Sequence, residues 1–201
     1  MPIVARERSL SGAGYFAPIF FDVNSAAPIY VGQLSERVVW IRVEGKGSFQ
    51  NSPELKEFAE CMIERGASHF VVDLENCPVM DSTFMGTLVG IVSQIDSEKE
   101  DAGLEIINAN ERNSQLVQSL GLNHVFSVDT EGTAWADVRG EISETACSPE
   151  QLAHVELDKR ENTEHVLEAH QQLTCADEGN VPRFRDVIDF LKKELQSTGS
   201  A

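Results

Sequence analysis

The chain has 201 residues and a mass of 22.2 kDa, which is enough for one ordinary domain or for one domain with a short appendage. Acidic residues outnumber basic residues 33 to 16, and the resulting net charge of −17 opposes direct binding to nucleic acid or to anionic lipid headgroups. Because no apolar run reaches the roughly 18 residues that cross a bilayer and no signal-peptide pattern is present, we expect a cytoplasmic protein without membrane insertion.

The first part of the chain predicts two paired strands followed by a helix. We expect residues 1–27 to form an N-terminal tail. Residues 29–31 and 38–43 are apolar and β-branched, which is typical of strands, and the short connection between them predicts that they pair. Ser52 and Pro53 then favour the start of a helix, with serine as the N-cap and proline in the first turn.

Strands and helices alternate up to about residue 130. The nearly continuous apolar run at residues 69–74 is typical of a strand that is covered on both faces. A long apolar helix is expected after residue 81. Beyond it the sequence predicts a strand at residues 104–108, a helix at 111–120 that ends before Gly121, and a last strand at 125–128. This order predicts an α/β fold with a mainly parallel sheet.

The last third of the chain no longer alternates between strand-like and helix-like segments. Residues 131–148 are interpreted as a linker and residues 149–196 as an α-helical hairpin, whose two helices are separated by Gly179 and Asn180. The first of these helices is predicted at residues 149–173 and is highly charged. The second helix carries an amphipathic stripe formed by Phe184, Val187, Ile188, Leu191 and Leu195. We expect this stripe to pack on the earlier helix or on the sheet, or to form a dimer or partner surface.

Motifs for catalysis, nucleotide binding and metal binding are absent from the sequence. There is no P-loop, no glycine-rich dinucleotide fingerprint and no nucleophile elbow, so we expect no enzyme and no cofactor. The cysteines at positions 61, 77, 147 and 175 are far apart, which predicts reduced structural thiols and no metal site. His165 and His170 are five residues apart and are expected to be solvated side chains on a helix.

The segment around Ser82 is the most informative part of the sequence. Ser82 stands at the end of a loop and ahead of a helix, where serine is an ordinary N-cap. A phosphate on Ser82 would face free N–H groups and the positive end of the helix dipole, although the neighbouring Asp81 would oppose it. Gly86 and Gly90 share one helix face, which indicates either close packing on the sheet or a smooth patch on which a partner helix lies.

The stretch VVDLENCPVMDSTFMGTLVGIV at residues 71–92 resembles the STAS domain, the fold of bacterial anti-sigma-factor antagonists. The resemblance covers residues 28–130, including Gly121-Leu122, and leaves the C-terminal hairpin outside. The usual family pattern continues as D-S-S-G-L-G. In this chain Phe84 replaces the first glycine, where its ring would either obstruct a kinase or anchor a partner, and Gly86 keeps the second.

The resemblance implies a regulatory protein-binding module in a partner-switching pathway of transcription control and signal transduction. In such antagonists the hydroxyl after the aspartate is phosphorylated, so the resemblance implies a phosphoprotein in which Ser82 is the modified residue. The implied partners are an anti-sigma factor or a serine kinase of the histidine-kinase-like ATPase type, with a phosphatase as a further partner. The implied partner-binding residues are Asp81, Thr83, Phe84, Gly86 and Gly90.

Two other functions stay open at this point. The chain is alternatively a STAS subunit of a lipid or anion transport complex, which would bind a transporter protein. A hydrolase that uses Ser82 as its nucleophile is the third hypothesis, and it requires a base within hydrogen-bond distance of the serine hydroxyl.

Overall fold

The computed structural model describes residues 27–99, 101–131, 133–135 and 150–198. The predicted N-terminal tail, apart from its last residue, and most of the predicted linker lie outside the described residues. So does Cys147, one of the four cysteines.

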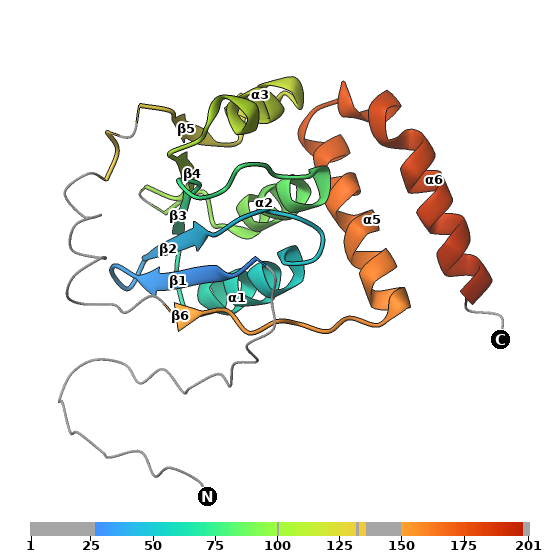
Figure 1. Ribbon diagram of the computed structural model, residues 1–201, viewed down its shortest axis with the longest axis horizontal. Coiled ribbons are helices and arrows are strands. Elements are labelled where there is room, and N and C mark those ends of the chain that lie inside the picture. The colour runs from blue at the N-terminus through green and yellow to red at the C-terminus, as the bar shows by residue number, and fades with distance from the viewer. Residues whose placement is uncertain (1–26, 100, 132, 136–149, 199–201) are drawn as a thin grey trace, which may run out of the picture.

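A six-stranded sheet forms the centre of the structure, with the strand order β5-β4-β3-β2-β1-β6. The strands are β1 (Ile29–Gln33), β2 (Val38–Val43), β3 (His69–Asp73), β4 (Gly103–Ile107), β5 (Ser127–Asp129) and β6 (Glu150–Gln151). Strands β2 to β5 run parallel, whereas β1 pairs antiparallel with β2 and with β6. The predicted α/β fold with a mainly parallel sheet is therefore confirmed (Figure 1).

One face of the sheet carries the main core, to which helices α1 (Ser52–Glu64), α2 (Ser82–Gln94) and α3 (Glu111–Ser119) contribute. Alternate strand residues point to this face, so that Ile41, Phe70 and Ile106 are fully buried in it. The opposite face holds a smaller cluster around Trp40, Val71 and Ile107. This division follows from the two-residue period of a strand, which sends successive side chains to opposite faces.

The C-terminal hairpin consists of α5 (Lys159–Ala176) and α6 (Asn180–Thr198). Its predicted turn and second helix are confirmed, but the first helix begins later than predicted. Residues 150–151 form strand β6 instead, because the chain here pairs with the free edge of β1. Helix α5 starts where Asp158 and Glu161 form a reciprocal capping box. No helix in the described part of the chain is long and apolar enough to span a membrane.

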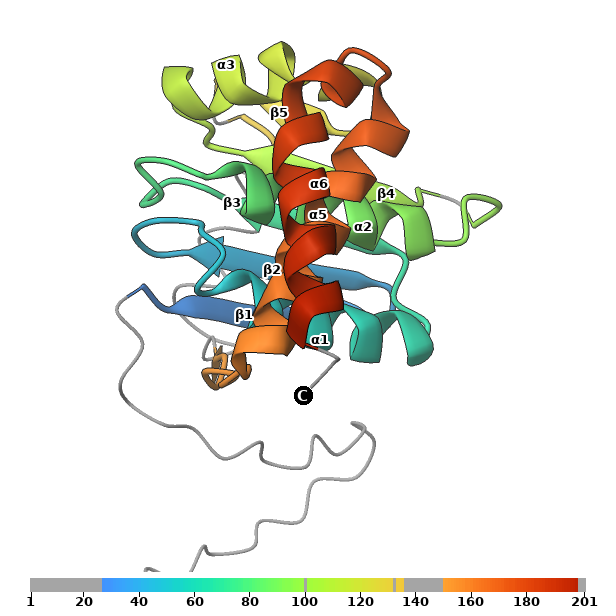
Figure 2. The same cartoon turned by 90° about the vertical axis from the view of Figure 1, so that its right-hand side faces the viewer.

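Helix α5 packs across α2, and α6 packs on the outer side of α5 (Figures 1 and 2). The predicted stripe on α6 faces inward, with Phe184 and Leu191 buried and Val187 and Ile188 packed against the same core. The prediction that this stripe packs on the earlier helix is therefore confirmed.

Polar contacts fix the turn of the hairpin against the end of α3. The Asn180 side chain is buried and donates hydrogen bonds to the carbonyl oxygens of Leu120 (2.9 Å) and Leu173 (3.0 Å). Gly121 follows α3 with a φ of +67°, the left-handed conformation expected of a C′ glycine. A Cβ atom there would lie 2.3 Å from Asp177 Oδ2, so the glycine also allows the hairpin to approach closely.

We predict that Leu173→Ala destabilises the protein, because Leu173 on α5 is fully buried in the main core. The expected loss in the free energy of unfolding is about 2–5 kcal/mol, from lost apolar transfer and the cavity that remains. Urea unfolding measures it. Phe190→Ala on α6 is the control, because 64% of Phe190 is exposed and its truncation leaves no cavity. Equal unfolding midpoints for the two variants would contradict the packing of α5 on the core.

Candidate protein-binding site

Asp81 organises the start of α2. Its side chain accepts a hydrogen bond from the Phe84 backbone N–H (2.9 Å) and another from the Phe49 N–H (3.0 Å) in the loop between β2 and α1. The Asp81 backbone N–H in turn donates to the carbonyl of Gly47 (2.9 Å). Asp81 is therefore both the N-cap of α2 and the link between the two loops that follow the carboxyl ends of β2 and β3.

The prediction that Ser82 and Ser52 are N-caps is wrong by one position in each case. The N-cap positions are held by Asp81 and Asn51, and each serine is the first residue of its helix. Because Asp81 already occupies the capping role at α2, the Ser82 hydroxyl is not engaged by the helix N–H groups. It is therefore available to contacts from outside the helix.

Helix α5 supplies that contact. The Ser82 Oγ lies 3.1 Å from His170 Nε2, although the two residues are 88 positions apart in the sequence. His170 Nδ1 lies 2.8 Å from the carbonyl oxygen of Val166, which only accepts hydrogen bonds, so Nδ1 carries a proton. In the neutral imidazole Nε2 is then the acceptor, and the Ser82 hydroxyl donates its proton to it.

A second serine–histidine pair joins α5 to the neighbouring helix α1. The Oγ of Ser52, at the start of α1, lies 2.7 Å from His165 Nε2, and both side chains are buried. Lys56 on α1 pairs with Glu168 on α5 beside them. Burial lowers the pKa of His165 below its ordinary value of 6.5, and Lys56 lowers it further, whereas the charges of Glu168 and Asp81 act in the opposite direction.

The expectation that His165 and His170 are solvated is therefore wrong. They are 7% and 5% exposed, and both face the domain. The spacing of five residues places them about 140° apart around the helix, which argues against a common partner. They have different partners, since one contacts the start of α1 and the other the start of α2.

The two glycines of α2 form the surface against which α5 packs. A Cβ atom at Gly86 would lie 2.1 Å from the carbonyl oxygen of Ala169, so only glycine allows the two backbones to approach this closely. Gly90 faces the side chain of Gln172 one turn further along. One of the two interpretations from the sequence was that a partner helix lies on this face. A helix does lie there, but it is α5 of the same chain.

The other predicted site residues are placed as follows. Ser82 and Asp81 are partly exposed at the surface, whereas Thr83 is 5% exposed and Phe84 is fully buried in the core. The Phe84 ring lies beneath Gly47 and does not stand in front of Ser82. That Asp81, Thr83, Phe84, Gly86 and Gly90 bind a partner stays a prediction.

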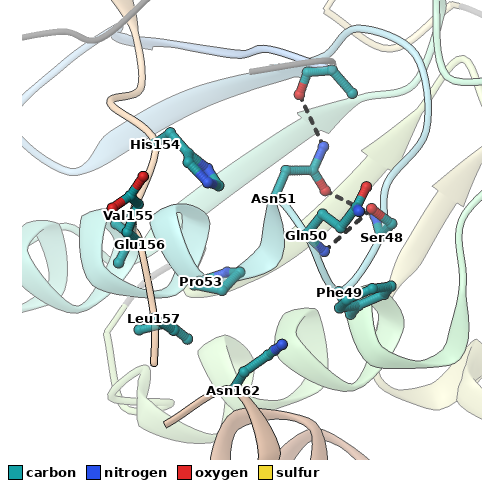
Figure 3. A pocket seen from close by; sticks show the side chains of 11 residues that line it. Ser48, Phe49, Gln50, Asn51, Pro53, His154, Val155, Glu156, Leu157 and Asn162 are labelled. Carbon is teal, nitrogen blue, oxygen red and sulfur yellow. Dashed lines mark hydrogen bonds between the residues drawn. The ribbon is translucent and has the colours of Figure 1, made fainter. Parts of the chain in front are cut away.

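A cavity of about 560 Å³ lies beside this site, between the loop Ser48–Asn51 and the extended segment His154–Leu157 that leads to α5 (Figure 3). The Asn51 side chain holds the loop in place by donating to the carbonyls of Ala27 and Lys46 and by accepting from Ser48 N–H. Ser82 is not among the residues that line this cavity.

Three cysteines lie within the described residues, and all three are free thiols: Cys61, Cys77 and Cys175. Cys77 is buried in the loop before α2, and burial raises the pKa of its thiol. Within the described part of the chain, no group of three or more His, Cys, Asp and Glu side chains is arranged to hold a metal ion.

The family model of the STAS domain matches residues 33–134, which is about half of the chain and includes β2 to β5 and α1 to α3. The chain belongs to the STAS domain family. The resemblance stated from the sequence is thereby confirmed, and the α5–α6 hairpin lies outside the matched residues.

Among relatives, the chain is similar to the anti-sigma-B factor antagonists of Staphylococcus aureus (strain NCTC 8325 / PS 47) and Staphylococcus epidermidis. Each is 32% identical over 93 residues, which cover 46% of this chain and 83% of the relative. Among solved structures, the unphosphorylated anti-sigma factor antagonist SpoIIAA is 18% identical, with a TM-score of 0.48 over 56% of this chain and 96% of that chain. An anti-sigma factor antagonist from Mycobacterium paratuberculosis is 14% identical, with a TM-score of 0.47 over 62% of this chain and all of that chain.

We predict that the docking of α5 weakens in mild acid. Because the pKa of His165 is lowered in the docked state, that state binds fewer protons than the released state, in which the ordinary value of 6.5 applies. Docking therefore keeps its full free energy above about pH 6.5 and loses part of it as the pH falls below that value. Hydrogen exchange of α5 amides, corrected for intrinsic rates, measures the change between about pH 7.5 and about pH 5.5.

His165→Gln should reduce this pH dependence, because the amide cannot be protonated and can still bond to Ser52. His154→Gln is the comparison variant, since His154 lies on the segment before α5 and pairs with the Glu54 carboxylate, and it separates the loss of that ion pair from the loss of His165. An α5 whose protection does not change with pH in the unmodified protein would contradict the prediction.

Proposed function

We propose that this protein is an anti-sigma-factor antagonist that acts in the cytoplasm by binding a kinase-type anti-sigma factor, and that phosphorylation of Ser82 abolishes this binding. The observation that carries the proposal is the start of α2, where Asp81 caps the helix and leaves the partly exposed Ser82 hydroxyl unused by the helix N–H groups. The relatives named anti-sigma-B factor antagonists support the same assignment.

The chemistry of the position suits a phosphate. Ser82 is the first residue of α2, where unpaired N–H groups and the positive end of the helix dipole stabilise a negative charge. A phosphate adds about −1.5 to −2 charges. Placed next to Asp81 on a chain with a net charge of −17, it changes the local potential enough to repel a partner whose contact surface is complementary to the unmodified site.

Phe84 is no obstacle to a kinase in this proposal, because its ring is buried in the core and does not lie over the Ser82 hydroxyl. The departure from the usual family pattern therefore changes the packing beneath the site, where the ring fills space that glycine would leave.

The other two hypotheses have less support. The named relatives are antagonists of anti-sigma factors, which favours that assignment over a subunit of a transport complex. The base that a Ser82-dependent hydrolase requires is present as His170. However, Ser82 lines neither the cavity beside the site nor the narrow groove between α2 and α5, and a hydrolase needs room there for a substrate.

We predict that the cognate kinase modifies Ser82 and leaves Thr83 unmodified. The side chain of Ser82 is partly exposed at the start of α2, whereas Thr83 is 5% exposed and is turned toward the interior. Intact-mass measurement followed by peptide mapping of the protein from its own cell decides between the two hydroxyls. Phosphate on Thr83 alone, or on neither residue in the presence of the kinase, would contradict the proposal.

We predict that Ser82→Glu weakens binding to the anti-sigma factor by about 5- to 150-fold, because it adds negative charge at the contact surface. Ser82→Ala should bind and escape regulation. Isothermal titration with the purified anti-sigma factor measures the affinities. Ser93→Glu is the matched control, because Ser93 is an exposed residue near the other end of α2 and receives the same charge. Unchanged affinity for Ser82→Glu would place Ser82 outside the interface.

A further inference from the structure

The helical hairpin covers the part of α2 that holds the candidate site. Helix α5 crosses α2, and its residues Ala169, His170 and Gln172 contact Gly86, Ser82 and Gly90 of α2. Helix α6 lies on the outer side of α5, and Figure 2 shows both helices crossing in front of the helix layer. A protein that binds this face of α2 would therefore meet α5 first.

The interface between α5 and the domain is more polar than the sheet-facing side of α2, although Leu173 is buried in the main core. Helix α5 buries few large apolar side chains: its buried residues are Thr163, His165, Ala169, His170 and Leu173. His165 and His170 are hydrogen-bonded to Ser52 and Ser82, with the Lys56–Glu168 ion pair at the edge, and Thr163 donates to the Lys159 carbonyl of its own helix. Interfaces that separate and re-form within a chain are more polar than permanent ones, which resemble the inside of a domain.

The sheet-facing side of α2 shows the contrast. It contributes large apolar side chains to the main core, among them Phe84, Met85 and Leu88, which are fully buried. Helix α2 is thus held permanently by the sheet beneath it. Its other side, with Gly86 and Gly90, is a shallow surface fitted to a helix backbone.

The chain before α5 contacts the domain through the buried Leu152 and through His154, whose Nδ1 lies 3.5 Å from the Glu54 carboxylate. Strand β6 pairs with β1 and anchors the chain at the sheet edge. The segment Leu152–Asp158 then has no regular secondary structure, and the cavity of about 560 Å³ separates part of it from the loop Ser48–Asn51. Release of α5 and α6 therefore requires no strand pairing to break.

We propose that the α5–α6 hairpin is an autoinhibitory cover, and that the kinase and the protein partner reach Ser82 and the glycine face of α2 only after the hairpin has moved away. This inference rests on the proposed function, because it concerns access to the same site. The hairpin is a competitor for a surface that accepts a helix, and the tether gives it an effective concentration on the order of millimolar. The apparent affinity of a partner is reduced by the fraction of molecules in which the surface is open.

Two variants release the cover from opposite sides. Ala169→Arg places a long charged side chain on α5 where its backbone touches Gly86, and Gly86→Ala places a methyl group against the Ala169 carbonyl. Cys175→Arg is the matched control, because it adds the same charge to the exposed side of α5. Hydrogen exchange of the full chain should become at least about tenfold faster in α5 of the first two variants, while β2 and β3 stay protected.

Access to the site is then measured without any assumption about the kinase. Ser82→Cys is introduced into each background, and the rate of alkylation by iodoacetamide at position 82 is followed by peptide mass spectrometry. The released variants should react at least about fivefold faster than the Cys175→Arg control. In parallel, an extract of the source cells with ATP serves as the kinase probe on the Ser82 proteins, and phosphate on Ser82 should accumulate faster by a similar factor.

Each result decides between the hypotheses. Faster alkylation and faster phosphorylation support the cover. Faster alkylation without phosphate on Ser82 in any variant supports the cover and refutes the proposed phosphorylation. Unchanged alkylation after α5 has been released, or measurable phosphorylation of Ser82 at an equal rate in released and control proteins, overturns the cover. Loss of protection in β2 and β3 together with α5 shows that the hairpin is a permanent part of the core, and this also overturns it.

Discussion

The arrangement of the site depends on the close approach of two helix backbones at Gly86. A Cβ atom on that residue would lie 2.1 Å from the Ala169 carbonyl oxygen, so any other residue would push α5 away from α2. The hydrogen bonds between the two α5 histidines and the hydroxyls of Ser52 and Ser82 span 2.7 and 3.1 Å and tolerate no such displacement. One missing methyl group therefore determines whether the C-terminal third of the chain can contact the start of both helices.

The strands and helices of the STAS domain could be predicted because their sequence signals are local. Apolar runs such as residues 38–43 and 69–74 coincide with β2 and β3, and Gly121 lies in the left-handed conformation that its position after a helix indicated. Boundaries were predicted less well: β5 begins at Ser127 rather than at residue 125, and the region after Pro149 starts as strand β6. Pairing of β6 with β1 is a long-range interaction that two residues of sequence cannot signal.

The contact of α5 with the domain could not be predicted, because its interface carries little apolar periodicity. Histidine, threonine and alanine on a charged helix are typical of a solvated surface, and the i, i+5 spacing of His165 and His170 gave no common face. The signal that was available lay in α2, where Gly86 and Gly90 predicted a close neighbour. The sequence could indicate that a helix packs there, but not that this helix comes from the same chain.

The position of the N-caps links the local structure to the regulation that we propose. Asp81 and Asn51 occupy the N-cap positions, so the hydroxyls of Ser82 and Ser52 do not cap their helices, which is the usual role of serine at a helix start. Both hydroxyls are bonded to α5, and only the one on α2 is partly exposed. The same oxygen therefore holds the hairpin and is the proposed site of phosphorylation. Since two ligands that exclude each other from one surface weaken each other reciprocally, the affinity of a partner and the docking of the hairpin cannot be set independently.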